Sequence, residues 1–138
     1  MTGVYVAVAA ILMATVSGLV WRHRNGVLRA RKGGGVERLD AAEIGAALGD
    51  RATLVQFSSA FCAPCRATRR VLGEVSEMVD GVAHVELDAE AHLDLVRRLN
   101  VLRTPTVFVL DASGRIVRRG SGLPRKADII AALGDAVA

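Results

Sequence analysis

Hydrophobic and polar positions divide the chain into one long apolar run near the N-terminus and a remainder of short alternating segments. The run Val4–Trp21 has no charged side chain over 18 residues, and about 27 Å of helix is enough to cross the core of a bilayer. A buried core helix would normally carry a polar stripe, and a signal peptide would begin with basic residues. The run shows neither feature, so we predict a transmembrane anchor over residues 1–21, with Tyr5 and Trp21 near the interfaces.

The remaining chain, residues 36–138, alternates patterns typical of strands and helices. Apolar runs with β-branched residues predict strands over residues 36–39, 53–57, 82–88, 106–110 and 115–119. Helical spacing and end signals predict helices over residues 40–48, 62–79, 90–99 and 126–137. The order β-α-β-α-β-α-β-β-α predicts an α/β sandwich in which helices flank a central mixed sheet, with the last two strands forming an antiparallel hairpin.

Two of these helices carry more specific signals. Asp40 is a good N-cap for the first helix, and Glu43 stands three residues later, where it completes a capping box. In the 62–79 helix, the spacing of apolar residues predicts one buried face. That face is expected to contain Ala67, Val71, Val75 and Met78.

Positive charge is concentrated between the apolar run and the predicted domain. Five of the 18 Lys and Arg residues lie within residues 22–32, whereas the chain from residue 33 onward holds 13 basic and 14 acidic side chains, a net charge of 13 − 14 = −1. A nucleic-acid partner is therefore not favoured. Because basic residues beside a membrane span stay on the cytoplasmic side, the cluster predicts a cytoplasmic domain. We assign residues 22–35 as a basic juxtamembrane segment ending in a glycine hinge, Gly33–Gly35.

The only two cysteines, Cys62 and Cys65, lie where a predicted strand gives way to a predicted helix. Unpaired N–H groups and the positive end of the helix dipole favour a thiolate at such a position, and Pro64 suits the first helical turn. The spacing lets the two side chains face each other across that turn and form a reversible disulfide. The pattern indicates thiol–disulfide exchange with no cofactor besides the Cys62–Cys65 disulfide.

Zinc binding and inert buried thiols are the alternative explanations of a Cys-x-x-Cys pair. Zinc in a structural site takes about four ligands, and His23, His84 and His92 have no ligand-like spacing to the cysteines. We therefore predict no metal site. A pair of inert thiols stays open as an interpretation, although the position at a helix start favours reactive ones.

The Cys-Ala-Pro-Cys motif after a buried strand, together with the later Arg103-Thr104-Pro105-Thr106, resembles the thioredoxin family. The resemblance covers residues 36–138 and implies a thioredoxin-like sandwich in which Cys62 attacks a substrate disulfide and Cys65 resolves the mixed disulfide. It also implies that Pro105 is a cis-proline, although trans is the commoner isomer, and that the Thr104 backbone pairs with an extended substrate. Substrate contacts are then expected from Phe61, Ala63, Pro64, Thr104, Pro105 and Gly122.

Three residues depart from the pattern usual in that family. Gln56 occupies the position of a buried acid that assists proton transfer at the second cysteine, and an amide cannot take up a proton. Phe61 stands where tryptophan is common, and Ala63 replaces the usual glycine between the cysteines. Residues between the cysteines tune the redox potential, and the sequence leaves the direction of that change open.

These expectations combine into a membrane-tethered, thioredoxin-like protein-disulfide reductase on the cytoplasmic side. Its expected partners are protein disulfides or dithiols, membrane lipid, and an electron donor such as a thioredoxin reductase or a membrane redox protein. One alternative keeps the chemistry but places the domain outside the cytoplasm, as in thiol–disulfide oxidoreductases of bacterial envelopes. Another is a redox sensor or scaffold without turnover. The Ala-, Arg-, Gly- and Val-rich composition is typical of bacterial proteins.

Overall fold

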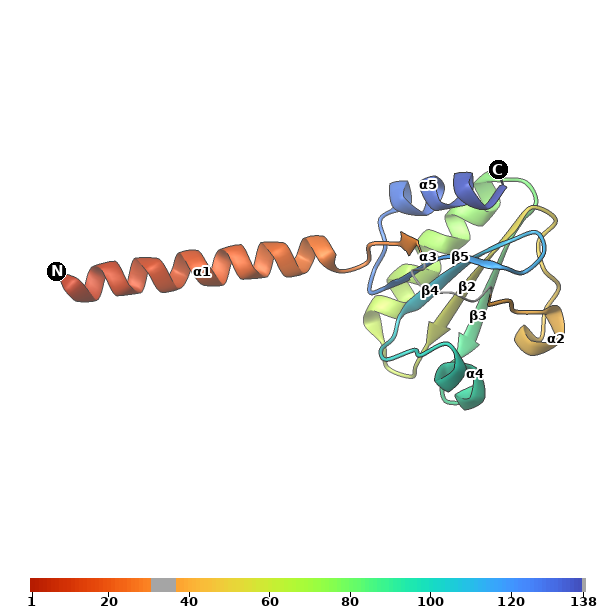
Figure 1. The fold of residues 1–138 in the computed structure, drawn as a ribbon, viewed down its shortest axis with the longest axis horizontal. Helices are drawn as coiled ribbons and strands as arrows, with labels where there is room; N and C mark the ends of the chain where they lie inside the picture. Colours follow the sequence, from red (N-terminus) through yellow and green to blue (C-terminus); the bar gives the residue numbers. More distant parts are fainter. Residues whose placement is uncertain (31–36, 138) are drawn as a thin grey trace.

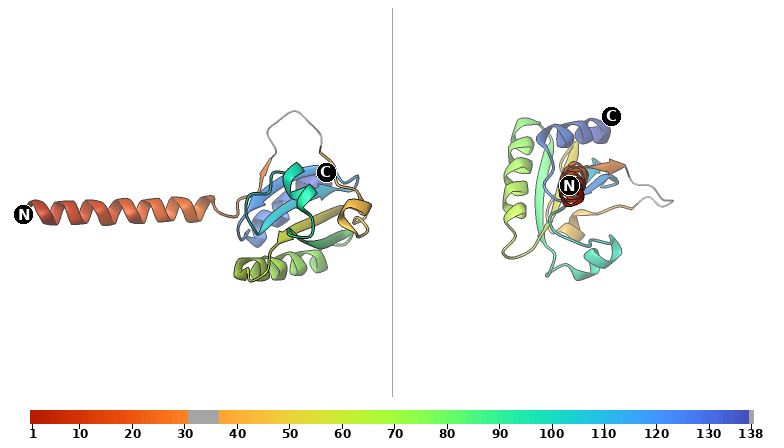
Figure 2. Two further views of the ribbon diagram at one scale, coloured as in Figure 1. Left: turned by 90° about the horizontal axis from the view of Figure 1, so that it is seen from below. Right: turned by 90° about the vertical axis from the view of Figure 1, so that its left-hand side faces the viewer.

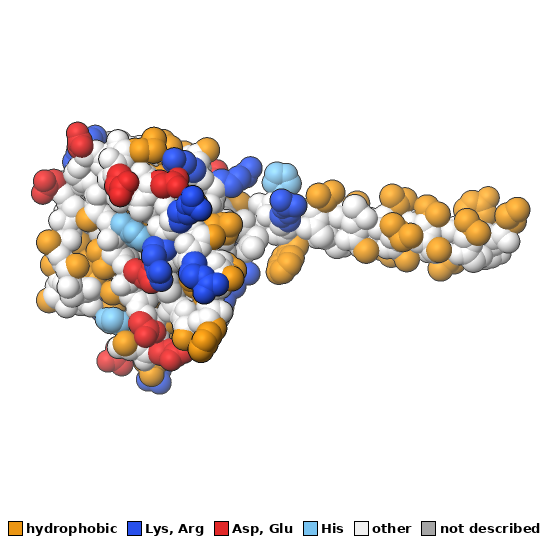
Figure 3. Space-filling model, turned by 180° about the vertical axis from the view of Figure 1, so that it is seen from behind, with side chains coloured by type: hydrophobic (Ala, Val, Ile, Leu, Met, Phe, Trp, Pro, Cys, Tyr) orange, Lys and Arg blue, Asp and Glu red, His pale blue; other side chains and the backbone are white. Residues whose placement is uncertain are grey.

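A long N-terminal helix, α1 (Thr2–Arg24), projects from a globular part that contains all the other elements (Figure 1). The structure is a computed structural model that describes residues 1–30 and 37–137. No residue of α1 is buried. Its visible face is hydrophobic or uncharged along most of its length, with basic and histidine side chains where it meets the globular part (Figure 3). By length and composition, α1 is therefore a candidate membrane span.

The globular part is built on a five-stranded mixed sheet with the strand order β1-β5-β4-β2-β3. The interior strand β2 pairs in parallel with β3 and antiparallel with β4, while β5 pairs antiparallel with β4 and with the short edge strand β1. The strands are β1 (Arg29–Ala30), β2 (Ala52–Ser58), β3 (Val82–Asp88), β4 (Thr106–Asp111) and β5 (Ile116–Ser121). The predicted mixed sheet and the antiparallel hairpin of β4 and β5 are confirmed.

Helices cover both faces of this sheet (Figure 2). The helices are α2 (Ala41–Ile44), α3 (Ala63–Met78), α4 (Leu93–Arg98) and α5 (Lys126–Val137). Side chains alternate between the two faces of a strand, so β2 directs Leu54 into a core with α3 and α5, and Val55 and Phe57 into a core with α2 and α4. All seven residues of β2 are buried, which makes β2 the central element of the α/β sandwich.

The short helices α2 and α4 begin and end at recognisable signals. The predicted capping box is present, since Asp40 Oδ1 accepts from the Glu43 N–H at 2.7 Å and Glu43 Oε2 accepts from the Asp40 N–H at 3.0 Å. However, α2 stops before Gly45, whose φ of 68° is left-handed and ends the helix earlier than predicted. The helix α4 starts later than predicted, because the Asp88 side chain accepts from the Glu90 N–H and fixes a turn there.

The buried face of α3 is not the one predicted. Met78 is 62% exposed, and Ala67 and Val71 are only half-buried. The buried residues of α3 are Cys65, Thr68, Leu72 and Val75. Val75 is the one predicted position that is buried. The observed face is rotated relative to the predicted one, because it turns Cys65 and the polar Thr68 inward, and the spacing of apolar residues alone does not reveal this rotation.

The globular part also starts earlier than predicted. Residues 22–35 were assigned to a basic juxtamembrane segment that ends in a glycine hinge, outside the domain. In the structure, Arg29 and Ala30 form β1 and pair with β5, and the Gly26 N–H donates to the Ser121 carbonyl at 2.7 Å. These contacts are made by the backbone, so they leave no hydrophobic pattern in the sequence. The chain therefore joins the sheet directly after α1.

The strand predicted over residues 36–39 is reduced to an isolated bridge between Arg38 and Arg115. Flanking hydrogen bonds of 3.0 Å join the Leu39 N–H to the Gly114 carbonyl and the Ile116 N–H to the Glu37 carbonyl. Residue 36 and the predicted hinge Gly33–Gly35 lie outside the described residues.

The observed face of α3 predicts which substitutions destabilise the fold. We expect Leu72→Ala, at a fully buried position, to lower the free energy of unfolding by about 3 kcal/mol, because it removes buried methyl groups and leaves a cavity. Met78→Ala, at an exposed position, should change it by less than about 1 kcal/mol. Pulse proteolysis of the full chain over a urea series measures both values. A larger effect at Met78 would contradict the observed face.

Candidate active site

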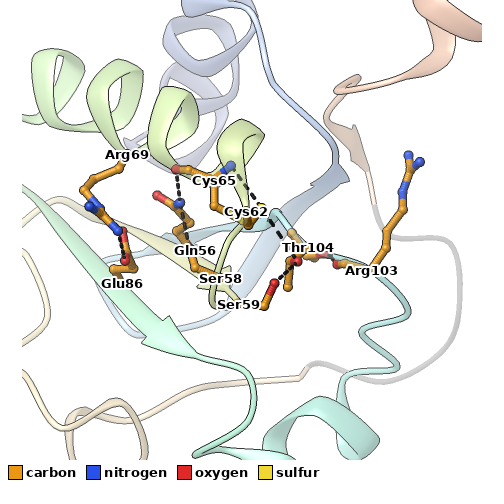
Figure 4. Close-up of a disulfide and its surroundings, with 10 residues drawn as sticks. Gln56, Ser58, Ser59, Cys62, Cys65, Arg69, Glu86, Arg103 and Thr104 are labelled. Atoms are coloured by element: carbon orange, nitrogen blue, oxygen red, sulfur yellow. Dashed lines mark hydrogen bonds and ion pairs between the residues drawn. A yellow bond between two sulfur atoms is a disulfide. The ribbon is translucent and has the colours of Figure 1, made fainter.

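The two cysteines form a disulfide at the N-terminus of α3 (Figure 4). Cys62 is the N-cap residue of the helix, and Pro64 lies in its first turn. The Cys65 N–H donates to Cys62 Sγ at 3.2 Å, and the two Cα atoms are 5.2 Å apart. A thiolate at Cys62 would receive the same N–H and the positive end of the helix dipole, so the local structure favours negative charge on this sulfur.

The two cysteines differ in exposure. Cys65 is 2% exposed, whereas Cys62 is half-buried. Around Cys62, the predicted substrate contacts Phe61, Ala63 and Pro64 are all exposed, and Phe61 adopts a left-handed backbone conformation with φ of 58°. An incoming disulfide can therefore reach Cys62, while Cys65 is shielded from solvent.

The loop that precedes β4 lies against Cys62. The Thr104–Pro105 peptide bond is cis, as the family resemblance implies, and Thr104 Oγ1 lies 3.9 Å from Cys62 Sγ. Ser59, which follows β2, is hydrogen-bonded through its hydroxyl to Thr104 Oγ1 at 2.8 Å (Figure 4). Ser59 is not among the predicted site residues, because nothing in the local sequence pattern reveals a partner so distant in the chain.

Gly122 is joined to this loop through its backbone. Its N–H donates to the Pro105 carbonyl at 2.8 Å, and its φ is +87°. The side chain of Asn25 fills the space that a Cβ on residue 122 would need, and Asn25 Oδ1 also accepts from Arg103 at 2.8 Å. Both the backbone conformation and this contact require glycine here. Asn25 itself was missed because it lies in the basic juxtamembrane segment that was placed outside the domain.

Gln56 lies on β2 beneath the start of α3 and is fully buried. Its amide nitrogen donates to the Cys65 carbonyl at 2.8 Å and to Ser58 Oγ at 2.9 Å, as Figure 4 shows. Its amide oxygen lies 3.2 Å from His84 Nε2. Because an amide oxygen can only accept, His84 carries its proton on Nε2 in this arrangement. The amide thus links β2 and β3 to the turn that carries the disulfide.

A comparison with family models assigns this domain. A model described as Thioredoxin matches residues 38–135, more than half of the chain, and the match includes both cysteines, Pro105 and Gly122. The chain belongs to the thioredoxin family. A thioredoxin from Alicyclobacillus acidocaldarius subsp. acidocaldarius is 32% identical to it over 88 residues, which cover 63% of this chain and 83% of that protein.

A second relative and a solved structure extend the comparison. Chloroplastic thioredoxin Y2 of Arabidopsis thaliana is 34% identical over 74 residues, or 53% of this chain and 44% of that protein. The crystal structure of chloroplastic thioredoxin z superposes with a TM-score of 0.60 at 24% identity, over 77% of this chain and 97% of that one. The structural likeness establishes the thioredoxin fold. Family membership and the Cys62–Cys65 pair together support a thiol–disulfide oxidoreductase.

Metal binding has no ligand set in the described part of the thioredoxin domain. Among residues 1–30 and 37–137, no three His, Cys, Asp or Glu side chains are grouped as a metal ion would require. Zinc needs such a group. The absence of a metal site in the whole chain stays a prediction.

His84 is the titratable group next to the Gln56 amide. Burial lowers the pKa of His84, and the neighbouring charges of Glu86 and Arg69 act in opposite directions, the carboxylate raising and the guanidinium lowering it. Glu86 and Arg69 also pair with each other, with Nε–Oε2 and Nη2–Oε1 distances of 2.5 and 2.6 Å. The imidazole is therefore held neutral at pH 7, in the form that donates one proton to Gln56.

The lowered pKa of His84 predicts a pH-dependent stability. The unfolded chain binds the His84 proton at higher pH than the folded chain, so stability rises with pH through this group. Its contribution is complete above the unfolded pKa of about 6.5 and is lost as the pH falls below that value. His84→Gln keeps a donor for Gln56 but does not titrate. Urea unfolding of both proteins between about pH 7.5 and pH 5 should show a smaller loss in the variant. Equal losses would contradict the assignment.

Proposed function

We propose that the chain is a membrane-tethered thiol–disulfide oxidoreductase that reduces disulfides in proteins. The observation that carries this proposal is the Cys62–Cys65 disulfide at the N-terminus of α3, in which Cys65 is buried and the half-buried Cys62 lies against the Thr104–Pro105 loop. The difference in exposure between the two cysteines supports an order of events. Cys62 meets the substrate first, and Cys65 acts afterwards from within the protein.

The reaction starts from the reduced dithiol. The Cys62 thiolate attacks one sulfur of a substrate disulfide, a mixed disulfide forms, and the other substrate sulfur leaves as a thiolate that takes up a proton. The Cys65 thiol loses its proton and attacks Cys62 Sγ, which releases the second substrate sulfur and forms the Cys62–Cys65 disulfide. The protein gives up two electrons and two protons, and the substrate gains both.

The chain's own groups assist the first step more than the second. The Cys65 N–H and the helix dipole favour the Cys62 thiolate. The Thr104 hydroxyl oxygen lies 3.9 Å from the same sulfur. For the second step, Gln56 contacts the Cys65 backbone but cannot accept the thiol proton. That proton passes to solvent or to the leaving substrate thiolate.

The substrate occupies the exposed rim around Cys62. Phe61 and Pro64 offer apolar surface beside the reacting sulfur, and the backbone of Thr104 pairs with an extended segment of the substrate. Pro105 and Gly122 act from behind, because the 2.8 Å hydrogen bond between them fixes the loop that bears Thr104. No cofactor is needed beyond the cysteine pair.

Location determines the direction of net electron flow. With α1 across the membrane, the basic residues that follow it favour a cytoplasmic domain. In that reducing compartment both cysteines rest as thiols, so the protein acts as a reductase. It then needs an electron donor, which is a thioredoxin reductase or a redox protein of the membrane, to regenerate the dithiol.

Cysteine variants test the catalytic proposal. With insulin as substrate and dithiothreitol as recycling reductant, we expect turnover by the wild-type chain and loss of that turnover in Cys62→Ser, which lacks the attacking sulfur. Cys65→Ser should retain the first step and accumulate a mixed disulfide on Cys62, detected by intact mass. Ala131→Ser, which adds a hydroxyl at an exposed position of α5, is the control and should match the wild type. Disulfide formation without any turnover would favour a redox sensor instead.

A reporter fusion tests the orientation. Alkaline phosphatase, which is active only after export, is fused after Ala138, and a parallel fusion carries a fluorescent protein that matures in the cytoplasm. We expect an inactive but stably expressed phosphatase and a bright fluorescent fusion, because the basic residues after α1 remain inside. The reverse pair of results would place the domain outside the cytoplasm and make it an envelope oxidoreductase.

A further inference from the structure

An arginine-rich pocket lies next to the end of α1. Its volume is about 980 Å³, within the range of small-molecule sites. Half of the ten residues that line it are arginines, and none is acidic. The arginines are Arg24, Arg29, Arg98, Arg103 and Arg119. They come from α1, β1, α4, the loop before β4, and β5, so the fold brings together five cations that are dispersed in the sequence.

Two of these arginines are held in place by neutral oxygens. Arg119 donates to the carbonyls of Leu99 and Asn100 at 2.7 and 3.1 Å, and its guanidinium lies 5.0 Å from the centre of the Phe108 ring. Arg103 donates to Asn25 Oδ1 at 2.8 Å, and Figure 4 shows its side chain pointing away from the cysteines. In each of these hydrogen bonds the acceptor that holds the guanidinium group is a neutral oxygen. The positive charge is positioned before any ligand arrives.

The other three arginines differ in whether a carboxylate compensates their charge. Arg98 pairs with Glu43 and also feels the charge of Glu37, so it contributes less. Arg24 and Arg29 are exposed and have no side-chain partner among the described residues. Like charges at this density repel one another, and an anion relieves that repulsion. Planar guanidinium groups match the oxygens of a phosphate in paired hydrogen bonds.

The position of the pocket indicates the source of the phosphate. Arg24 belongs to the last turn of α1, the candidate membrane span, and Arg29 follows five residues later. If α1 crosses the bilayer, the pocket lies at the level of the headgroups. We propose that it binds the phosphate of an anionic phospholipid. The choice of a lipid rests on the proposed membrane tether, whereas the affinity for phosphate rests on the pocket alone.

Lipid bound in this pocket would sit beside the redox site. Arg103 directly precedes Thr104, and Ser121, another lining residue, directly precedes Gly122. Asn25 accepts a hydrogen bond from Arg103 and lies against Gly122. A bound headgroup therefore fixes the orientation of the Thr104–Pro105 loop relative to the membrane surface, and with it the direction from which a substrate approaches Cys62.

Lipid titration of the full chain tests the proposal. The protein is purified in a neutral maltoside detergent and titrated with dioleoyl phosphatidylglycerol, dioleoyl phosphatidylcholine or inorganic phosphate, and native mass spectrometry counts the bound molecules. The variant Arg24→Gln/Arg29→Gln removes two charges from the pocket. The control Arg22→Gln/Arg97→Gln removes the same charge from the end of α1 and from α4, at residues that do not line it.

We expect the wild type and the control to bind phosphatidylglycerol about tenfold more tightly than phosphatidylcholine, and the pocket variant to lose most of that preference. Equal effects of the two double variants would overturn the site, because only net charge would then matter. Binding of free phosphate without binding of phosphatidylglycerol would overturn the lipid as ligand. Because the titration is done in detergent, its result does not depend on whether α1 spans a bilayer in cells. Alkaline extraction of membranes tests that spanning separately. Insulin turnover of the same samples reports the redox function.

Discussion

The structure depends on the hydrogen bond from the buried Gln56 amide to the Cys65 carbonyl. This bond of 2.8 Å joins the central strand to the first turn of α3, and a buried amide without a partner would be costly. The fold therefore positions the helix so that the bond is made. With this bond in place, Cys65 is buried beneath the helix start and Cys62 is left half-buried at its N-cap. The redox pair is held by a polar contact in the core as much as by hydrophobic packing.

The same amide defines how this protein departs from the usual thioredoxin pattern. A neutral side chain is easier to bury than a carboxylic acid that must ionise, and every polar atom of Gln56 finds a partner in Cys65, Ser58 or His84. The Gln56 side chain is therefore held by three hydrogen bonds, but it cannot accept a proton from Cys65. In the proposed mechanism, the attack by the half-buried Cys62 does not need this acceptor, whereas the proton of Cys65 must pass to solvent or substrate.

The segment after α1 is part of the domain and does not simply connect the helix to it. Asn25 touches Gly122 and bonds Arg103, and Gly26 and β1 extend the sheet along β5. The arginine pocket thus includes Arg24 from the end of the candidate membrane span and Arg103 from the loop that contains the cis-proline. The residues that follow this candidate span therefore pack against the loop that faces Cys62.

The sequence determined the elements and the chemistry, because both are recorded in local patterns. β3 over residues 82–88 and α5 over residues 126–137 have the predicted bounds, and the capping box and the helix-start position of the cysteine pair are local signals as well. Only the tertiary structure decided the buried face of α3, the pairing of β1, the contacts of Asn25 and Ser59, and the gathering of five arginines. Those features depend on backbone hydrogen bonds and on contacts between residues far apart in the chain, which no local pattern records.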